Sequence, residues 1–371
     1  MAGAAGAADT GASVAEAGGG GTNPFWQVTN LYARKNKQGI VSGQVLDAST
    51  HDGGGAIDAV GFLRGPRLVV RSTAASGTAG TPSADNPANF FKQVGLQNTD
   101  GTEIMQNLIG GYAYLQRHRF FRPWLKDPML AYDYAQSTAP SFTLFLQAEV
   151  RQQLGCLENT DTRQQYSWTH TINTIANLGI TGTGPTSSVT PYVDVWAQPD
   201  VADLEGVTNE RIPPGVNLQC KTRHYTFTLA VAGADNNFLS PLTGNALRGG
   251  LLIVRDSNNA RQDYLSDPIT WTLDDRTLSI MSPDIVFQWQ SDFYATFGQP
   301  RAPRPVGVYP FPRFFDSGHM YGQGWLYTSN ATSVAWETST LATATNVPGT
   351  VELLQEEVYA VGAVDASLLD M

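Results

Sequence analysis

Alternating apolar and polar positions dominate the chain and predict short β-strands. In Arg223–Val231 one side of the segment has the apolar and aromatic residues Tyr225, Phe227, Leu229 and Val231, and the other side has Thr226, Thr228 and Ala230. A period of two carried by aromatic and β-branched residues indicates a strand with one buried face. Small and polar residues at 232–237 then indicate a loop. We predict that this strand opens a β-sandwich.

An internal repeat is the second feature of the pattern. Three pairs of segments share a layout at an offset of about 156 residues: Arg67–Ser72 with Arg223–Val231, Phe90–Gly101 with Leu251–Asn259, and Asp127–Tyr134 with Ser282–Trp289. The first two pairs are strand-like segments followed by polar loops. The third pair has a cap residue, a proline and then apolar residues, which predicts short helices. Three landmarks in the same order indicate a duplicated fold.

The domain boundaries follow from shifts in composition. We expect a flexible Gly/Ala-rich tail at 1–22, an amphipathic helix at 23–39, a first sandwich at 40–205, a second at 206–365 and a C-terminal tail at 366–371. The junction lies in the acidic, turn-rich segment 199–214, which contains Pro213-Pro214.

The N-terminal helix is predicted from Asn23-Pro24, a cap residue followed by a proline at the first helical position. Its apolar face and basic end contain Phe25, Trp26, Val28, Leu31, Tyr32, Arg34, Lys35 and Lys37. Two interpretations remain open. The helix is either an amphipathic foot on a membrane surface or a short helix docked on its own or a neighbouring subunit.

Composition changes the picture at the surface. Of the 371 residues, 42% are hydrophobic and only 15% are charged, so large parts of the surface must be neutral and polar. Such a surface is typical of a protein that buries its flanks against copies of itself. The net charge of −10 and the pI near 4.9 argue against direct packaging of nucleic acid, which needs a basic footprint.

The two cysteines, Cys156 and Cys220, are too few for a disulfide framework, so we expect two free buried thiols. Such thiols fit assembly in a reducing compartment. The sequence contains no stretch of ~18 apolar residues and no N-terminal signal-peptide pattern, so we expect the protein to be made in the cytoplasm.

Candidate chemistry is sparse. The histidines at 51, 118, 170, 224 and 319 occur in no metal-binding spacing, and no nucleophile or phosphate-binding motif has a suitable context. Neighbouring residues on a strand point to opposite faces, so neither Asp274-Asp275 nor Glu356-Glu357 is expected to form an acid/base pair. We interpret both pairs as solvated turn charges. We therefore predict no catalytic residue, no metal and no cofactor, and a protein that is not an enzyme.

One basic-aromatic cluster stands out. It contains Arg117, His118, Arg119 and Trp124, with Phe120 and Phe121 between them. The cluster could stack single-stranded nucleic acid. On an acidic chain we favour a subunit contact.

Together these features resemble the double jelly-roll major capsid proteins, and among them the coat proteins of tectiviruses, tailless phages with a membrane inside the shell. The resemblance rests on Asn23–Lys37, Phe90–Gly101, Arg223–Val231, Leu251–Val254 and the cap-proline segments at 127 and 282. It implies an all-β fold of two tandem eight-stranded jelly rolls, with a short N-terminal helix and short inter-strand helices.

The resemblance also implies an assembly. The chain would form pseudo-hexagonal homotrimers that build an icosahedral capsid over an internal viral membrane, which the N-terminal helix would touch. Minor capsid and vertex proteins would be further partners, and direct contact with nucleic acid is not expected. The protein would be located in the virion after synthesis in the host cytoplasm.

Two other classes remain open. A jelly-roll carbohydrate-binding module or viral spike would need exposed aromatic side chains, which Trp325, Tyr327 and Trp336 could supply. A cupin-like enzyme would need a bound metal.

Overall fold

The computed structural model describes most of the chain between residues 26 and 360. The described residues are 26–28, 41–59, 61–73, 84–98, 101, 103–105, 109–122, 127, 141–150, 155–197, 218–241, 244–274, 276–296, 302–312, 325–328 and 331–360. No helix among them is long and apolar enough to cross a membrane.

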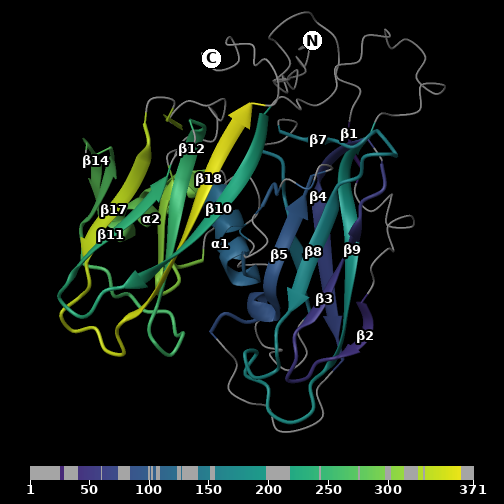
Figure 1. The fold of residues 1–371 in the computed structure, drawn as a ribbon, viewed down its shortest axis with the longest axis horizontal. Helices are drawn as coiled ribbons and strands as arrows, with labels where there is room; N and C mark the ends of the chain where they lie inside the picture. Colours follow the sequence, from purple (N-terminus) through teal and green to yellow (C-terminus); the bar gives the residue numbers. More distant parts are fainter. Residues whose placement is uncertain are drawn as a thin grey trace, which may run out of the picture.

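The second half of the chain folds into a sandwich of two antiparallel sheets (Figure 1). One sheet has the order β10 (Leu218–Leu229), β18 (Gly349–Ala360), β12 (Ala246–Arg255) and β15 (Val308–Pro312), and the short β16 (Leu326–Tyr327) also pairs with β12. The facing sheet has the order β11 (Asp235–Pro241), β17 (Ser333–Ser339), β13 (Ile269–Leu273) and β14 (Arg276–Met281). From β10 to β13 the chain alternates between the two sheets, β13 and β14 then form a hairpin in one sheet, and β15 returns to the other, which is the jelly-roll arrangement.

The first half repeats this order. Its larger sheet contains β2 (Val41–Val45), β9 (Thr186–Ala197), β4 (Phe62–Ser72) and β6 (Phe142–Phe145), and β1 (Trp26–Val28) and β7 (Leu157–Glu158) pair at its margins. The facing sheet contains β3 (His51–Ala56), β8 (Ser167–Ile172) and β5 (Phe91–Gln97). The place of an eighth strand beside β5 is taken by isolated bridges at Glu103 and Ile109. The predicted pair of tandem jelly rolls is therefore confirmed.

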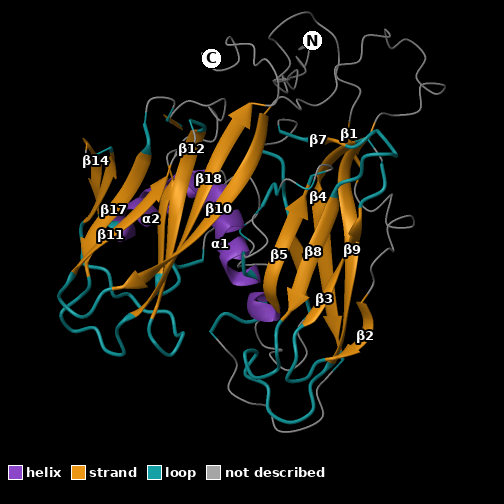
Figure 2. Ribbon diagram, in the orientation of Figure 1, coloured by secondary structure: helices purple, strands orange, loops and turns teal. Residues whose placement is uncertain are grey.

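Few helices accompany the strands (Figure 2). In each roll an α-helix precedes the fourth strand of the larger sheet: α1 (Gly111–Phe121) precedes β6, and α2 (Pro283–Thr296) precedes β15. The 3-10 turn η2 (Ala88–Phe90) packs against α1. In Figures 1 and 2, α1 lies between the two sandwiches, so the helix of the first roll forms much of the junction.

Strand β12 is buried on both faces, and this explains its sequence. Leu252 and Val254 belong to the core of the second sandwich, whereas Leu251 and Ile253 belong to the core cluster that surrounds α1. A strand covered on both sides reads as a continuous apolar run rather than an alternation. Gly250 is needed in this strand because a Cβ there would lie 2.3 Å from the Trp336 ring.

The structure pairs different segments of the internal repeat than the sequence pattern suggested. Sheet order makes β4 the counterpart of β12, and β10 the counterpart of β2. Leu63–Ser72 and Leu247–Asp256 are 184 residues apart and match at Leu, Arg, Gly, Leu, Val and Arg. Arg67–Ser72 therefore belongs to the third strand of its roll, not to an opening strand, and the offset of about 156 residues is wrong although the duplication is right.

A glycine bulge marks the repeat in both rolls. β4 shifts register against β9 between Leu63 and Gly65, and β12 shifts against β18 between Leu247 and Gly249. Both glycines have positive φ, +143° and +156°, which L side chains rarely adopt. Gly65-Pro66 therefore lies at a bulge inside one long strand.

The N-terminal prediction also needs correction. Trp26–Val28 is a strand paired antiparallel with Val195–Ala197 of β9, not part of a helix. A strand satisfies its backbone groups across the sheet, so the edge of β9 overrides the local helical spacing. The remainder of 23–39 lies outside the described residues. So do 128–134, the larger part of the first predicted cap-proline helix, whereas the second corresponds to α2.

Candidate functional site at the junction of the two sandwiches

A buried ion cluster joins the two sandwiches. Glu356 of β18 is 0% exposed, and its Oε2 lies 3.0 Å from Nε of Arg117 on α1. Its Oε1 contacts Arg122, which follows α1, and Arg248 of β12. The helix of the first roll and two strands of the second therefore share one carboxylate.

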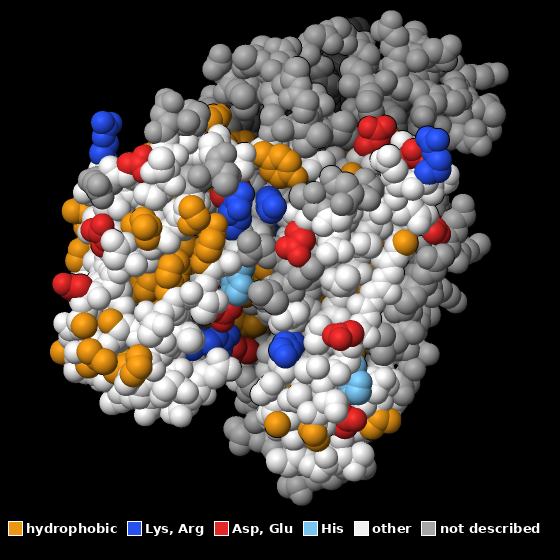
Figure 3. Space-filling model, viewed as in Figure 1, with side chains coloured by type: hydrophobic (Ala, Val, Ile, Leu, Met, Phe, Trp, Pro, Cys, Tyr) orange, Lys and Arg blue, Asp and Glu red, His pale blue; other side chains and the backbone are white. Residues whose placement is uncertain are grey.

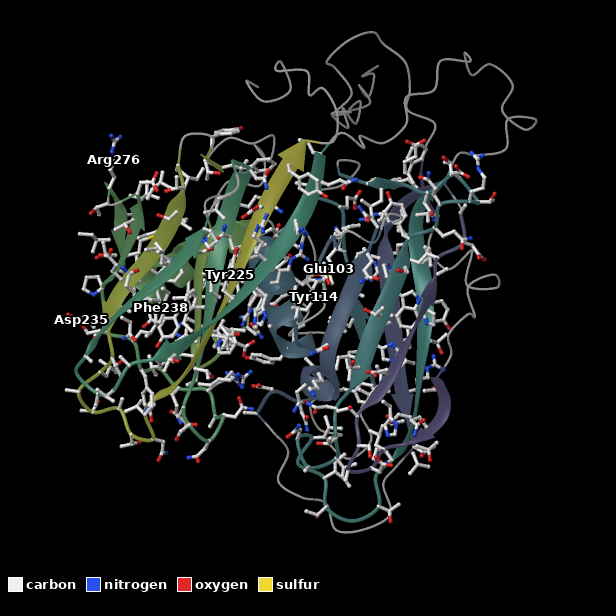
Figure 4. All side chains as sticks on the ribbon, in the orientation of Figure 1. Glu103, Tyr114, Tyr225, Asp235, Phe238 and Arg276 are labelled. Carbon is white, nitrogen blue, oxygen red and sulfur yellow. The ribbon has the colours of Figure 1, made fainter. Side chains whose placement is uncertain are left out.

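The surrounding groups complete the cluster. Arg117 donates from Nη1 to the Tyr114 hydroxyl at 2.9 Å and from Nη2 to Cys220 Sγ at 3.4 Å. Arg248 donates to the Phe121 carbonyl at 3.2 Å, at the end of α1. Figure 4 labels Tyr114 in the space between the sandwiches. The predicted free, buried state of Cys156 and Cys220 is confirmed, and Cys220 belongs to this cluster.

Electrostatics keep the Glu356 carboxylate ionised. Burial alone would raise the pKa of Glu356, but the guanidinium groups of Arg117, Arg122 and Arg248 offset this and lower it to about 2. Burial, together with Glu356, raises the pKa of the Cys220 thiol. The thiol is thus held neutral and away from nucleophilic chemistry.

The same positions carry ion pairs in both rolls. Arg64 and Arg248 each precede the bulge glycine, and Asp194 and Glu356 lie opposite that glycine on the partner strand. In the first roll Asp194 pairs with Arg67, and Arg64 Nε lies 2.6 Å from Glu149 Oε2. A bulge re-aims side chains, and here it directs a buried arginine into each roll.

A second ionic contact crosses the junction at its other end. Asp85, in the loop before η2, lies 2.6 Å from Nη2 of Arg255 and 2.5 Å from Nε of Arg261. Arg255 Nε also lies 2.9 Å from Glu352 Oε1, and Glu352 Oε2 lies 3.3 Å from His224 Nε2. His224 therefore belongs to an interior ion network on the edge strand β10. In Figure 3, charged side chains gather along the hollow between the two lobes.

The backbone also bridges the sandwiches. Glu103 and Ile109 form bridges to Gln97 and Val94 of β5, and Met105 forms a parallel bridge to Thr222 of β10. The small sheet of the first roll is thereby connected to the edge of the large sheet of the second. This covers part of the long β10 edge, which would otherwise be open to unwanted pairing.

Buried ion pairs dominate the described residues of the junction. Among the described residues, no group of three or more His, Cys, Asp or Glu side chains is arranged to hold a metal ion.

The predicted solvated state of Glu356 and Glu357 is wrong, since both are buried and Glu357 pairs with Arg223 at 3.0 Å. Asp274, by contrast, is a turn residue whose carboxylate accepts hydrogen bonds from Thr332 and Ser333, which lower its pKa.

The predicted subunit contact is corrected for two of its four residues. Arg117 and Arg119 are each 1% exposed, and Arg119 Nε lies 3.3 Å from Asp127 within the same chain. A side chain that the chain itself buries is not available to a neighbour or to nucleic acid. His118 is half-buried and its ring lies 6.4 Å from that of Phe145, whereas Trp124 lies outside the described residues.

The aromatic side chains considered for carbohydrate binding do not form an exposed cluster. Trp336 is fully buried and stacks on Trp271 at 5.6 Å, and Trp325 is 5% exposed beneath Arg248. Only Tyr327 is exposed, at 49%. A sugar platform at this place therefore lacks its stacking surfaces.

The pattern of apolar positions does not reveal the ion cluster, but another feature of the sequence indicates it. Arg122 and Glu356 are 234 residues apart, so no local spacing connects them. The matched Leu-Arg-Gly segments at 63 and 247 are the detectable sign, because an arginine at the same place in both rolls needs an acid in each core.

Strand order and helix placement together define a double jelly roll. No protein-family model matches the chain, and no curated protein sequence matches it. Among solved structures, the chain is similar to the major capsid protein of Sulfolobus turreted icosahedral virus. The crystal structure of that protein gives a TM-score of 0.58 at 12% identity, with 91% of this chain and 97% of that chain covered.

Two further structures agree on the fold. The atomic structure of the Sulfolobus virus gives a TM-score of 0.61 at 12% identity, with 94% of this chain and 96% of that chain covered. A quasi-atomic model of the PBCV-1 virus capsid gives 0.55 at 14% identity, with 90% and 93% covered. The likeness therefore extends across both rolls and their junction.

Proposed function

We propose that this chain is a major capsid protein that assembles as homotrimers into an icosahedral shell. The observation that carries the proposal is the pair of jelly rolls joined through a buried junction. The similarity of this fold to that of viral capsid proteins covers more than nine-tenths of the chain. Three copies of a chain with two similar rolls present six similar walls, which suits hexagonal packing.

The flanks support self-association. In Figure 3, backbone and uncharged polar side chains cover most of the described surface, charged side chains are scattered, and hydrophobic side chains gather on the lobe of the second sandwich. On the outer face of the sheet β11-β17-β13-β14, Leu239 is 53% exposed and Ile280 is 64% exposed. Both lie on the face opposite the core residues Phe238 and Trp336. Apolar side chains on a neutral flank favour burial against a neighbour.

The oligomeric state tests the proposal. Light scattering coupled to size exclusion should give three times the chain mass of 40.0 kDa at micromolar concentration. Leu239→Asp with Ile280→Asp should weaken the trimer, whereas the exposed Glu158→Gln should leave it intact. A monodisperse monomer for the parent chain would contradict the capsid function.

Membrane association is a finer part of the proposal. The basic residues Arg34, Lys35 and Lys37 follow, in the sequence, the strand that pairs with β9. Clustered lysine and arginine attract anionic lipid surfaces, at about 1 kcal/mol per residue. We propose that this segment faces the internal membrane in the assembled shell.

Charge reversal separates this role from general electrostatics. The triple variant Arg34→Glu, Lys35→Glu, Lys37→Glu should lose binding to anionic vesicles in a flotation assay, and it leaves β1 in place. The control Lys92→Glu, Arg163→Glu, Arg276→Glu changes the net charge equally at exposed positions elsewhere. Equal binding by both variants would refute the membrane-facing segment.

A further inference from the structure

His170 is buried in the first sandwich in surroundings that offer its ring no polar contact. It is 3% exposed and lies on β8, the central strand of the sheet β3-β8-β5. Its ring stacks on Trp168, with centroids 5.1 Å apart and planes at 5°, and meets the edge of Phe91 at 5.5 Å. Neither ring nitrogen has a hydrogen-bond partner in the described part of the chain.

An unsatisfied buried imidazole is unusual, because buried polar groups in native proteins nearly always find partners. It is tolerable while the ring is neutral, when it behaves as a flat, largely apolar group. Protonation would place a full charge between two aromatic rings in a low-dielectric core, which costs far more than burying a neutral dipole. The site therefore discriminates strongly between the two protonation states.

The charged groups near His170 would stabilise its protonated ring only weakly. On β3 the neighbours are His51 and Asp52, and on β5 the neighbour is Lys92. Asp52 is exposed and its carboxylate already accepts from the Thr171 hydroxyl at 2.6 Å. On the facing sheet, β4 directs Leu68 and Val70 into the core, so its alternate residues Arg67 and Arg71 point away from His170.

We propose that His170 is an acid trigger, which loosens the small sheet of the first sandwich when the protein meets an acidic solution. The sheet is suited to this, because β3 contributes the run Gly53-Gly54-Gly55 beside His170 and so adds few side-chain contacts. The proposal rests on the proposed function for its meaning: a coat built from this protein would weaken on acidification.

The expected pH range follows from the direction of the shift. Burial lowers the pKa of His170 from its ordinary value of 6.5 to about 4, and Asp52 opposes this only in part. A histidine with a lowered folded pKa contributes its full stability above 6.5 and loses it as the pH falls toward 4. The folding equilibrium constant of the chain should therefore fall by up to about 300-fold over that range.

The test uses the full-length protein and needs no shell, so its failure is distinguishable from failure of the capsid function. The stability of the parent chain, its His170→Phe variant and its His51→Gln variant would be measured by denaturant unfolding at pH 7 and pH 4.5. His170→Phe keeps an aromatic ring but cannot titrate, so it should lose much less stability on acidification than the parent. His51→Gln, on the same sheet but partly exposed, should behave like the parent.

If the His170→Phe variant fails to fold, the titration of the His170 ring can be measured directly in the parent chain. The imidazole signal of His170 in the parent chain, followed by NMR, should titrate below pH 5, and amide exchange in β3 and β8 should accelerate over the same range. A titration near 6.5, or an acid response that is unchanged in a folded His170→Phe protein, would overturn the proposal.

Discussion

At the scale of single residues, the junction depends on one carboxylate. Arg117, Arg122 and Arg248 converge on Glu356, all at 1% exposure or less. Removing several guanidinium groups from water is costly, and the cost is recovered only when the negative partner is present and well placed. Glu356 is therefore the residue whose loss the junction can least tolerate.

Replacing that carboxylate tests this view. Glu356→Gln keeps the side-chain size but leaves buried arginines without their shared charge, so it should lower the free energy of unfolding by roughly 3–5 kcal/mol. Denaturant unfolding at pH 7 measures the change. The exposed Glu158→Gln is the matched control and should cost less than about 0.5 kcal/mol.

The pH dependence of that variant gives a second check. The pKa of Glu356 is lowered to about 2 in the folded protein, so its stabilising effect is complete above its ordinary value of 4.5 and is lost as the pH falls toward 2. The difference between parent and variant should thus persist at pH 5 and shrink below pH 4. A difference that does not change over this range would argue that packing, not charge, is responsible.

At the scale of elements, the sequence predicted strands better than it predicted their partners. The alternation in Arg223–Val231 correctly marked the first strand of the second roll, since β10 spans Leu218–Leu229. The same alternation could not say that Arg67–Ser72 is a third strand, because strand order is decided by contacts far apart in the chain. Pairing the wrong strands gave the wrong repeat offset.

The sequence pattern missed α1 and predicted a helix over Trp26–Val28, whereas it indicated α2 correctly. α1 buries nearly every residue, including Gln116 and Arg117, so it has no polar face to produce a helical period. The segment around Trp26 does have that period, yet Trp26–Val28 forms a strand because β9 offers it a partner. Tertiary contacts outweigh local preference at both places, and those contacts are not visible in a single sequence.

At the scale of the whole molecule, the core of the first roll extends into the second. The cluster around α1 includes Leu251, Ile253 and Leu354 of the second roll together with the first-roll strands. Burial at ~25 cal/mol per Å² of apolar surface makes this extended core a large part of the stability of each half. The ion contacts at Glu356 and Asp85 add polar groups that neither half satisfies alone.

The chain should therefore behave as one cooperative folding unit. A protease site placed between Ala197 and Leu218 in the full-length protein should be cleavable without separating the halves, which should co-elute and unfold in a single transition. Expressed alone, either half should be insoluble or lack a cooperative transition, because Arg117 and Arg122 would lose Glu356 and the face of β12 toward α1 would meet water. Refolding the two purified halves together should restore the complex. Independent, cooperative unfolding of the first half would show instead that the junction joins two self-sufficient domains.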